Sequence, residues 1–262
     1  MTRKLSVWMA ASLVSCSLLA GCATSSQQTQ TASPDDPYEN VNRKIYAFNT
    51  KVDEWVILPV TKGYRAITPN FAQEGVSNAV SNVGEPNNAV NNLLQGKVNA
   101  GIESAFRFLV NSTFGIGGLF DVASWIGMDK HKEDFGRTLA TWGVGPGPYL
   151  VLPLLGPSGV RDIWSWPVAY VTNPMTYVLS NEHMVGDSEW PAKLGWAAVT
   201  VVDARSSLID SGFDEMRANT IDEYVAVRDA YRRLREQGVH GDKISAEDEL
   251  KGLTPLVLDD DE

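Results

Sequence analysis

The sequence has little cysteine and little histidine, which limits the chemistry it can support. Among its 262 residues there are two cysteines, Cys16 and Cys22, and three histidines, His131, His183 and His240. No pair of these histidines has the spacing of metal ligands, so we predict no metal site. Cys16 lies in a segment that we expect to be removed, so the mature domain is predicted to have no disulfide. Packing or a membrane must then stabilise it.

Positive charge is also scarce. The chain has 22 Lys and Arg against 32 Asp and Glu, a formal net charge of −10. Binding to nucleic acid requires a basic face, so nucleic acid is excluded as an expected partner. Membranes stay open, because a protein can meet lipid through apolar surface with little help from charge. With 44% hydrophobic and 21% charged residues, the chain is globular and long enough for one domain.

Recognisable catalytic motifs are missing as well. The stretch Gly156–Gly159 lacks the spacing of a nucleophile elbow, and Ser158 is interpreted as a helix cap. The triplet Asp134–Gly136 matches a kinase motif, but none of the accompanying kinase motifs is present. The glycines of Gly143–Gly147 precede Pro148 and an apolar run rather than a helix N-terminus, which disfavours a phosphate-binding loop. We therefore predict a protein that is not an enzyme and has no cofactor.

The first 21 residues have the pattern of an export signal. Arg3 and Lys4 precede the apolar stretch Leu5–Leu19, which is too short to be a good membrane-spanning helix. The following residues, Leu19-Ala20-Gly21-Cys22, resemble the lipobox of bacterial lipoproteins, which implies cleavage before Cys22 and a covalent lipid on that cysteine. Ala23 at the next position implies sorting to the outer membrane. An ordinary signal peptide with a chance cysteine is the alternative.

Three segments follow the predicted signal peptide of residues 1–21. Residues 22–34 are small and polar, and we expect a flexible tether that reaches roughly 20 Å. Residues 35–238 carry helical periodicity with few strand-like alternations, so we expect one mainly α-helical domain. Residues 239–262 end in Asp259–Glu262, and we expect an acidic, disordered tail.

Caps, prolines and apolar spacing predict the helices of the domain. The first is expected to begin at Asp36 as the cap and to end at Pro59. A second begins at Thr68-Pro69 and fades at Gly84, and a third, rich in asparagine, begins at Glu85-Pro86. Further helices are predicted over three stretches: Val98–Val110, Ser188–Ile209 and Ile221–Leu234.

The stretch Asp134–Asp162 organises the rest of the chain. It contains the alternating run Gly143-Val144-Gly145-Pro146-Gly147-Pro148, then the apolar segment Tyr149–Leu155, and it closes on the adjacent pair Arg161-Asp162. Glycine and proline at this density mark turns or hinges. We predict an ordered, turn-rich loop with an apolar hairpin. The Arg161-Asp162 ion pair is expected to fix structure rather than to do chemistry.

Tryptophan is concentrated in one part of the chain. Six residues lie between positions 125 and 196, and in the mature chain only Trp55 lies outside: Trp125, Trp142, Trp164, Trp166, Trp190 and Trp196. Taken singly, each is predicted to be a core residue. Taken together with broad apolar helices in a tethered protein, they also fit an interfacial belt at the level of lipid headgroups. Both interpretations stay open at this point.

An ordered set of motifs runs from Asp36 to Asp162: Asp36-Pro37-Tyr38-Glu39, Asn42-Arg43, Phe48-Asn49, Glu85-Pro86, Leu94-Gln95-Gly96, Arg107-Phe108, Asn111-Ser112-Thr113, Asp121-Val122-Ala123, Phe135-Gly136, Gly143-Val144-Gly145, Gly147-Pro148-Tyr149 and Arg161-Asp162. This set resembles the MlaA (VacJ) family of outer-membrane lipoproteins. Residues 164–212 and the acidic tail match no motif of the family.

The resemblance implies a ring-like helical domain that lies in the inner, periplasm-facing leaflet of the outer membrane of a Gram-negative bacterium and contains an amphipathic channel. It implies removal of mislocalised phospholipids from the outer leaflet and their delivery to a soluble, MlaC-like periplasmic carrier, which maintains lipid asymmetry. Trimeric porins are the implied membrane partners.

The resemblance also implies roles for particular residues. Gly143, Gly145, Gly147, Pro148 and Tyr149 would form the hinge of a hairpin that gates the channel. In addition, Phe48 and Asn49 would lie on a helix that shapes it. Two other classes of function remain: a lipoprotein that only scaffolds porins, and a lipid-modifying enzyme, which lacks an evident nucleophile and base.

Overall fold

The computed structural model describes residues 36–181 and 189–239. The chain divides into two units, Met1–Pro34 and Asp35–Glu262. The first unit lies outside the described residues, and with it the predicted signal peptide and all of the tether, including Cys22. Of the predicted tail, only Val239 is described, as the last residue of a helix.

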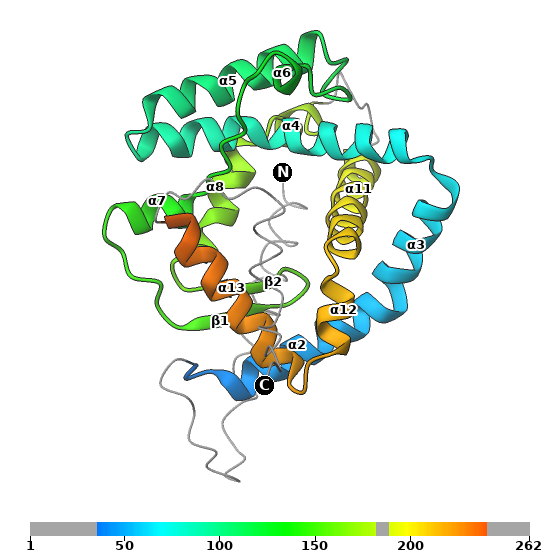
Figure 1. The fold of residues 1–262 in the computed structure, drawn as a ribbon, viewed down its shortest axis with the longest axis vertical. Coiled ribbons are helices and arrows are strands. Elements are labelled where there is room, and N and C mark those ends of the chain that lie inside the picture. The colour runs from blue at the N-terminus through cyan, green and yellow to red at the C-terminus, as the bar shows by residue number, and fades with distance from the viewer. Residues whose placement is uncertain (1–35, 182–188, 240–262) are drawn as a thin grey trace, which may run out of the picture. The chain divides into compact units, whose positions relative to one another are not determined.

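The second unit is mainly α-helical, which confirms the fold class predicted from the sequence (Figure 1). The elements of its first half are α2 (Glu39–Val52), the π-helix η2 (Asp53–Ile57), α3 (Leu58–Ile67), α4 (Asn70–Leu94), α5 (Val98–Thr113), α6 (Val122–Trp125) and α7 (Phe135–Thr141).

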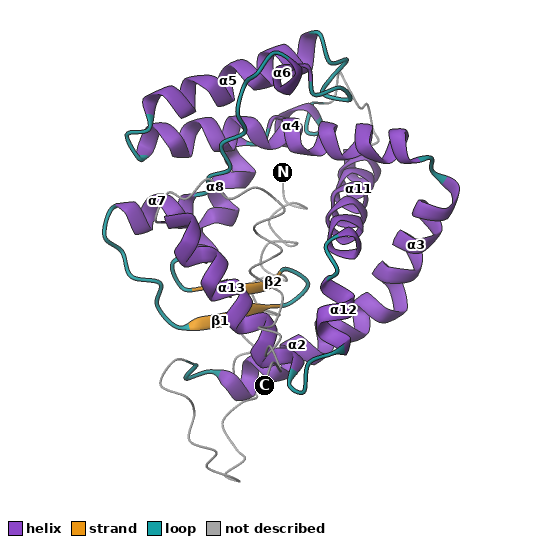
Figure 2. Ribbon diagram, in the orientation of Figure 1, coloured by secondary structure: helices purple, strands orange, loops and turns teal. Residues whose placement is uncertain are grey.

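Within the described residues, strands occur only in a two-stranded antiparallel sheet between α7 and the later helices (Figure 2). The elements of this second half are β1 (Tyr149–Leu152), β2 (Gly156–Gly159), the 3₁₀ helix η3 (Asp162–Trp164), α8 (Ser165–Thr172), α9 (Pro174–Val178), α11 (Glu189–Asp210), α12 (Phe213–Ala218) and α13 (Glu223–Val239).

The elements of this unit pack against one another in a closed circuit. The helix α2 packs against β1 and leads through η2 into α3, and α3 and α4 both contact α11. The long helix α4 also contacts α7 and α8, while α13 contacts α7, β2 and α12 (Figure 1). The circuit closes where β2 pairs with β1 beside α2. This order of contacts agrees with the ring-like arrangement expected of the domain.

Two predicted helix boundaries are wrong, both at prolines. The helix expected to end at Pro59 continues, because Pro59 occupies the first turn of α3, where a missing N–H is tolerated. The break expected between Gly84 and Pro86 is absent, and Pro86 lies inside the 25-residue helix α4. Burial of Glu85 in a network of hydrogen bonds with Arg107 and Asn88 holds the helix together there.

Two predicted caps are also wrong. Asp36 does not cap α2, since its carboxylate accepts hydrogen bonds from the side chains of Asn42 and Tyr224 instead. Ser158 lies in β2 opposite Leu150 rather than at a helix start. In both cases a partner distant in sequence, or a strand pairing, uses the residue that local chemistry would assign to a cap.

The distribution of polarity is inverted relative to an ordinary globular domain. Among the described residues, sixteen polar or charged side chains are buried, but only nine hydrophobic ones. The buried hydrophobic cluster of the described residues is small. It consists of Tyr149, Val151 and Tyr224, with Ile45, Tyr46, Val225 and Tyr231 packed against it. An apolar core of this size contributes little stabilisation for a domain of this length.

Helix α5 shows the inversion most clearly. Its predicted apolar face is exposed, including Ile102, Phe106 and Leu109, while Arg107 and Asn111 on the other side are buried. The amphipathic pattern was therefore identified correctly, but its direction is opposite to that of a helix packed on an apolar core.

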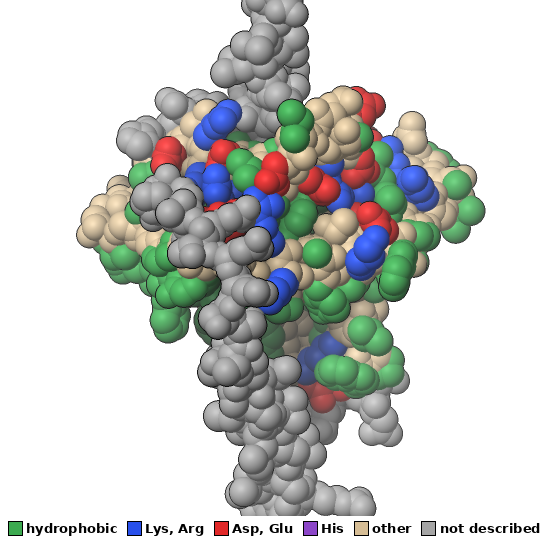
Figure 3. Space-filling model, turned by 90° about the horizontal axis from the view of Figure 1, so that it is seen from below, with side chains coloured by type: hydrophobic (Ala, Val, Ile, Leu, Met, Phe, Trp, Pro, Cys, Tyr) green, Lys and Arg blue, Asp and Glu red, His purple; other side chains and the backbone are tan. Residues whose placement is uncertain are grey.

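Six of the seven tryptophans of the second unit are exposed as well: Trp55, Trp125, Trp142, Trp164, Trp166 and Trp190. The interpretation of these six as core residues is wrong. On the side of the molecule that carries α2, hydrophobic side chains gather along one edge, below a zone that is rich in charged side chains (Figure 3). The outer surface thus suits an apolar environment rather than water.

Candidate functional site

The Gly/Pro-rich stretch forms a loop and a short hairpin, as predicted. Its strands β1 and β2 pair antiparallel, with Tyr149 opposite Gly159 and Leu152 opposite Gly156. The loop before β1 is joined to the chain after β2, because the backbone N–H of Val160 donates to the carbonyl of Pro148 at 3.2 Å. The hairpin is therefore a closed unit with a defined base.

The two ends of the hairpin differ in their surroundings. Near its base, Tyr149 and Val151 are each 2% exposed and pack with Tyr224 of α13. At the tip between the strands, Leu154 and Leu155 are exposed. The hairpin therefore has one face anchored in the small core and an apolar tip that projects from it.

Only two of the three predicted hinge glycines require glycine geometry. Gly143 and Gly147 have φ angles of +91° and +66°, in the left-handed region that L side chains rarely adopt. A Cβ atom on Gly147 would also lie 3.1 Å from Cβ of Val160. Gly145 does not have a positive φ, and a Cβ there would meet nothing within 4 Å. Their role in movement of the hairpin stays a prediction.

Asn42 of α2 forms hydrogen bonds with the edge of β1, in the place of a neighbouring strand. Its amide nitrogen donates to the carbonyl of Tyr149 at 3.0 Å, and its amide oxygen accepts from the N–H of Val151 at 3.0 Å. The same amide nitrogen donates to Oδ1 of Asp36 at 2.9 Å. Because Asn42 and Asp36 are buried, these contacts are shielded from water.

Asn49, two helical turns further along α2, repeats the arrangement closer to the tip. Its amide nitrogen donates to the carbonyl of Leu152 at 2.9 Å, and its amide oxygen accepts from the N–H of Leu154 at 2.8 Å. The neighbouring Phe48 is about half exposed. The structure thus joins the two predicted sites, the helix around Phe48-Asn49 and the hairpin. Side-chain amides of α2 supply the hydrogen bonds that a third strand would otherwise supply.

Asp36 links this edge to α13. Its second carboxylate oxygen accepts a hydrogen bond from the hydroxyl of Tyr224 and lies 3.8 Å from Nη1 of Arg228. The ring of Tyr224 meets the rings of Tyr46 and Tyr149 edge to face, with centroid distances of 5.8 and 6.2 Å. Burial, together with the hydrogen bond to Asp36, raises the pKa of Tyr224, so this hydroxyl keeps its proton.

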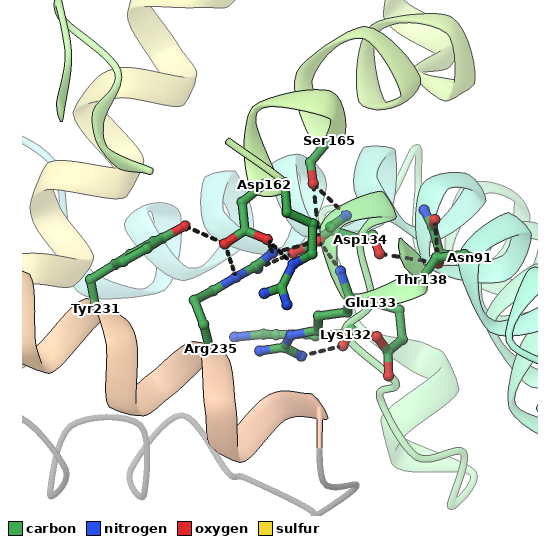
Figure 4. A network of polar contacts seen from close by, with 12 residues as sticks. Asn91, Lys132, Glu133, Asp134, Thr138, Asp162, Ser165, Tyr231 and Arg235 are labelled. Carbon is green, nitrogen blue, oxygen red and sulfur yellow. Dashed lines mark hydrogen bonds and ion pairs between the residues drawn. The ribbon is translucent and has the colours of Figure 1, made fainter. Parts of the chain in front are cut away.

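The predicted Arg161-Asp162 pair is present but is part of a larger network (Figure 4). Asp162 accepts hydrogen bonds from Nε of Arg161 at 2.9 Å, from the hydroxyl of Tyr231 at 2.7 Å and from Nε of Arg235 at 3.0 Å. Arg235 also pairs with Asp134, which caps α7. The network ties α7 and η3 to α13 at the base of the hairpin.

Arg235 lowers the pKa of the Asp134 carboxyl and of the Asp162 carboxyl. Burial opposes the charged form of Asp134, but the hydrogen bonds and charge of Arg235 outweigh it and lower the pKa of Asp134 from 3.8 to about 2. The pKa of Asp162 is lowered in the same way against the effect of burial. A buried, fully paired network of this kind is structural. No local pattern in the sequence indicates the contact of Asp134 with Arg235, since 101 residues separate them.

A second buried network, centred on Arg107 of α5, was not predicted as a site. Arg107 is fully buried and contacts Glu85 at 3.1 Å and Asp121 at 2.8 Å. It also donates to the carbonyl of Met128 at 2.7 Å. Burial opposes ionisation of Asp121, yet hydrogen bonds from Ser124 and others and the Arg107 charge lower its pKa to about 2. The network holds the loop after α5 against α4.

In each network a serine hydroxyl donates to a carboxylate, Ser165 to Asp134 at 3.0 Å and Ser124 to Asp121 at 2.7 Å. Arginine pairs with both carboxylates and their pKa values are lowered to about 2, so they are too weak as bases to activate these hydroxyls. In the described ranges, no three His, Cys, Asp or Glu side chains lie together in a group that could hold a metal ion. Within the same ranges, no helix is both long enough and apolar enough to cross a membrane. The domain thus combines a polar interior with a hairpin whose β1 edge is hydrogen-bonded to side chains of α2.

Comparison with known proteins identifies relatives over most of the chain. A family model described as "MlaA lipoprotein" matches residues 34–238. An uncharacterised protein of Rickettsia typhi is 41% identical over 205 residues, which cover 78% of each chain. The "Intermembrane phospholipid transport system lipoprotein MlaA" of Escherichia coli (strain K12) is 33% identical over 235 residues, which cover 88% of each chain.

A solved structure supports the same relationship at the level of the fold. It was determined in work on the "Structural basis for maintenance of bacterial outer membrane lipid asymmetry". It superposes with a TM-score of 0.65 at 33% sequence identity, over 78% of this chain and 98% of the other.

Proposed function

The chain belongs to the MlaA lipoprotein family, and from that premise we propose that it works in intermembrane phospholipid transport and maintains the lipid asymmetry of the outer membrane. In this proposal it removes mislocalised phospholipids from the outer leaflet and passes them to a soluble, MlaC-like periplasmic carrier. Its relatives are transport lipoproteins rather than enzymes by name, and we assign it no catalytic step.

The observation that carries the proposal is the inverted distribution of polarity. Side chains such as Trp125, Trp190 and Phe71 are exposed, and placing each in an apolar phase is worth roughly 1.5–3 kcal/mol. Dozens of such groups around one domain favour lipid as its surroundings. Buried side chains such as Asn91 and Asn92 form hydrogen bonds within their own helix and with a neighbouring loop, so the interior of the domain is polar. A protein that moves phospholipids must provide both environments.

The hairpin is the element that we assign to gating. Its tip carries exposed leucines, and the hydrogen bonds between its edge and α2 come from the side chains of Asn42 and Asn49. Side-chain contacts of this kind are easier to release than a full strand pairing. At its base, Gly143 and Gly147 adopt left-handed backbone angles, which glycine alone adopts without strain.

Anchoring is assigned to Cys22. The lipobox-like sequence before it supports a covalent lipid there, and Ala23 supports retention at the outer membrane. A lipid anchor followed by a short tether would keep the domain at the periplasmic face of that membrane. Trimeric porins are the partners that we propose within the membrane. The covalent lipid and the transported phospholipid are the only non-protein groups in this account.

A porin scaffold without transport activity is the second candidate. It shares the apolar exterior but needs neither the polar interior nor a pinned hairpin. A lipid-modifying enzyme is disfavoured because arginines pair with the carboxylates of Asp121 and Asp162. Incubation of the protein with phospholipid, followed by mass spectrometry of the lipids, is expected to show no product.

Surface-exposed phospholipid in living cells separates transport from scaffolding. We expect it to rise in cells that lack the gene and to return to normal when the wild-type gene is supplied. A Cys22→Ala gene should fail to restore it, since the unanchored protein leaves the membrane. Normal surface phospholipid in the deletion strain would refute the transport function and leave the scaffold.

A further inference from the structure

A polar pocket lies where α3, α4 and α11 meet, away from the hairpin. Its volume is about 400 Å³, within the range of roughly 300–1,000 Å³ that is usual for small-molecule sites. Such sites are usually lined mainly by apolar side chains, but this one has a single aromatic residue among polar and charged ones. Its lining consists of Tyr64, Arg65, Asn70, Gln73, Glu74, Ser77, Asn78, Asp203, Ser206, Ser207 and Asp210.

The spacing of these residues shows that α4 and α11 each turn a polar face toward the pocket. On α11 the lining positions are 203, 206, 207 and 210, and on α4 they are 70, 73, 74, 77 and 78. Both sets follow the three- and four-residue spacing of one helix face. The outward faces of the same helices carry exposed Phe71 and Val201. The polar faces of both helices therefore line the pocket, with Ser206 buried and Glu74 and Asp210 exposed toward solvent.

The charges in the pocket are of both signs. Arg65 pairs with Asp210 at 2.6 Å and donates to Oγ of Ser206 at 2.6 Å. Asp203 and Glu74 contribute two further carboxylates. The pocket therefore offers carboxylates beyond the one that Arg65 pairs with, and favours a ligand that brings a positive charge.

Two groups in the pocket would be stabilised by the partners that such a ligand supplies. Burial raises the pKa of Asp203, and only a hydrogen bond from Ser77 opposes the shift. The hydroxyl of Tyr64 is buried and makes no hydrogen bond with any part of the chain that the structure describes. A carboxylate that burial disfavours gains from a cation, and a buried hydroxyl gains from an anionic oxygen.

We propose that this pocket binds the phosphoethanolamine headgroup of a phospholipid, with the ammonium at Asp203 and Glu74 and the phosphate at Tyr64 and Arg65. The proposal rests on the transport function and names the lipid that is preferred. An anionic phospholipid without an amine would satisfy the phosphate side but would leave the carboxylates unpaired. It also gives α11 a role that the sequence did not suggest.

Competition between two lipids tests the pocket. The full-length protein is incubated with vesicles of equal amounts of phosphatidylethanolamine and phosphatidylglycerol, reisolated, and its bound lipids are quantified by mass spectrometry. We expect the wild type to be enriched in phosphatidylethanolamine. Asp203→Asn should reduce this enrichment on the order of tenfold, the effect of losing one hydrogen bond to a charged group. Total bound lipid should change little.

Glu54→Gln is the matched control, because it removes an exposed carboxylate on η2 outside the pocket. It should bind lipid in the wild-type ratio. Asp203→Asn should unfold at or above the wild-type temperature, since it removes a carboxylate that burial disfavours. Comparing the two variants thus separates headgroup recognition from folding.

The outcomes distinguish the pocket from the general function. A wild type that binds both lipids equally, or an Asp203→Asn protein with an unchanged ratio, overturns the headgroup proposal and leaves transport intact. A wild type that captures neither lipid overturns the proposed function itself. If free phosphoethanolamine displaces no lipid but binds the wild type and not Asp203→Asn, the pocket serves a soluble ligand and the headgroup proposal fails.

Discussion

The contact between Asn49 and the hairpin makes the sharpest prediction. Asn49→Asp preserves the size of the side chain and can still accept from the N–H of Leu154. It loses the donor to the carbonyl of Leu152 and places a carboxylate oxygen at the 2.9 Å position now held by the amide nitrogen. Leaving a carbonyl unpaired in this way costs about 1–3 kcal/mol.

We take about 2 kcal/mol for this cost, which corresponds to a roughly 30-fold increase in the population of the released hairpin. The cost falls on hairpin release rather than on global unfolding, because Asn42 and the core contacts of Tyr149 and Val151 remain. We therefore expect faster hydrogen exchange of the amides in residues 149–159, an unchanged melting temperature within a few degrees, and altered surface phospholipid in cells.

Asn40→Asp is the control for this experiment. Asn40 is an exposed residue in the first turn of the same helix, and the substitution introduces the same charge. An acidic residue at a helix N-terminus is mildly stabilising, so exchange in the hairpin should stay at the wild-type rate. Equal exchange rates in Asn49→Asp and wild type would refute the view that the α2 side chains hold the hairpin.

Three further predictions concern the base of the hairpin, the buried network and the outer surface. Gly147→Val should lower stability by about 1–3 kcal/mol because of its left-handed backbone, while Gly145→Val should be tolerated, as thermal unfolding of each can show. The Asp134 pair, with a pKa of about 2, should contribute about 2 kcal/mol above pH 4 that is lost as the pH falls toward 2; urea titrations should show this slope weakened in Arg235→Gln. Brominated lipids should quench the fluorescence of exposed tryptophans such as Trp190 in vesicles, and unchanged fluorescence would contradict contact with lipid.

The amphipathic helices were predictable, but the side that they bury was not. The spacing of Ile102, Phe106 and Leu109 identifies a helix with one apolar face, and that spacing is the same whether the face meets a core or a membrane. Composition does not separate the two cases either, because the same residues serve both. For this reason the sequence alone does not decide whether the tryptophans lie in a core or at a membrane surface.

The polar contacts depended on neighbours that local sequence does not reveal. Asp36 has the right position to cap a helix, yet its carboxylate accepts hydrogen bonds from Asn42 and Tyr224 instead. Proline usually breaks a helix, yet α4 continues past Pro86, where the neighbouring Glu85 is hydrogen-bonded to Arg107. The candidate hairpin could be predicted because glycine and proline act locally.

Transfer of phospholipid in a purified system tests the central claim most directly. The full-length protein is reconstituted into vesicles that contain fluorescent phosphatidylethanolamine, and loss of label to a soluble lipid acceptor is followed over time. We predict transfer that depends on the protein and that changes in Asn49→Asp but not in Asn40→Asp. A rate equal to that of vesicles without protein would contradict the account and reduce the domain to a lipid-embedded scaffold.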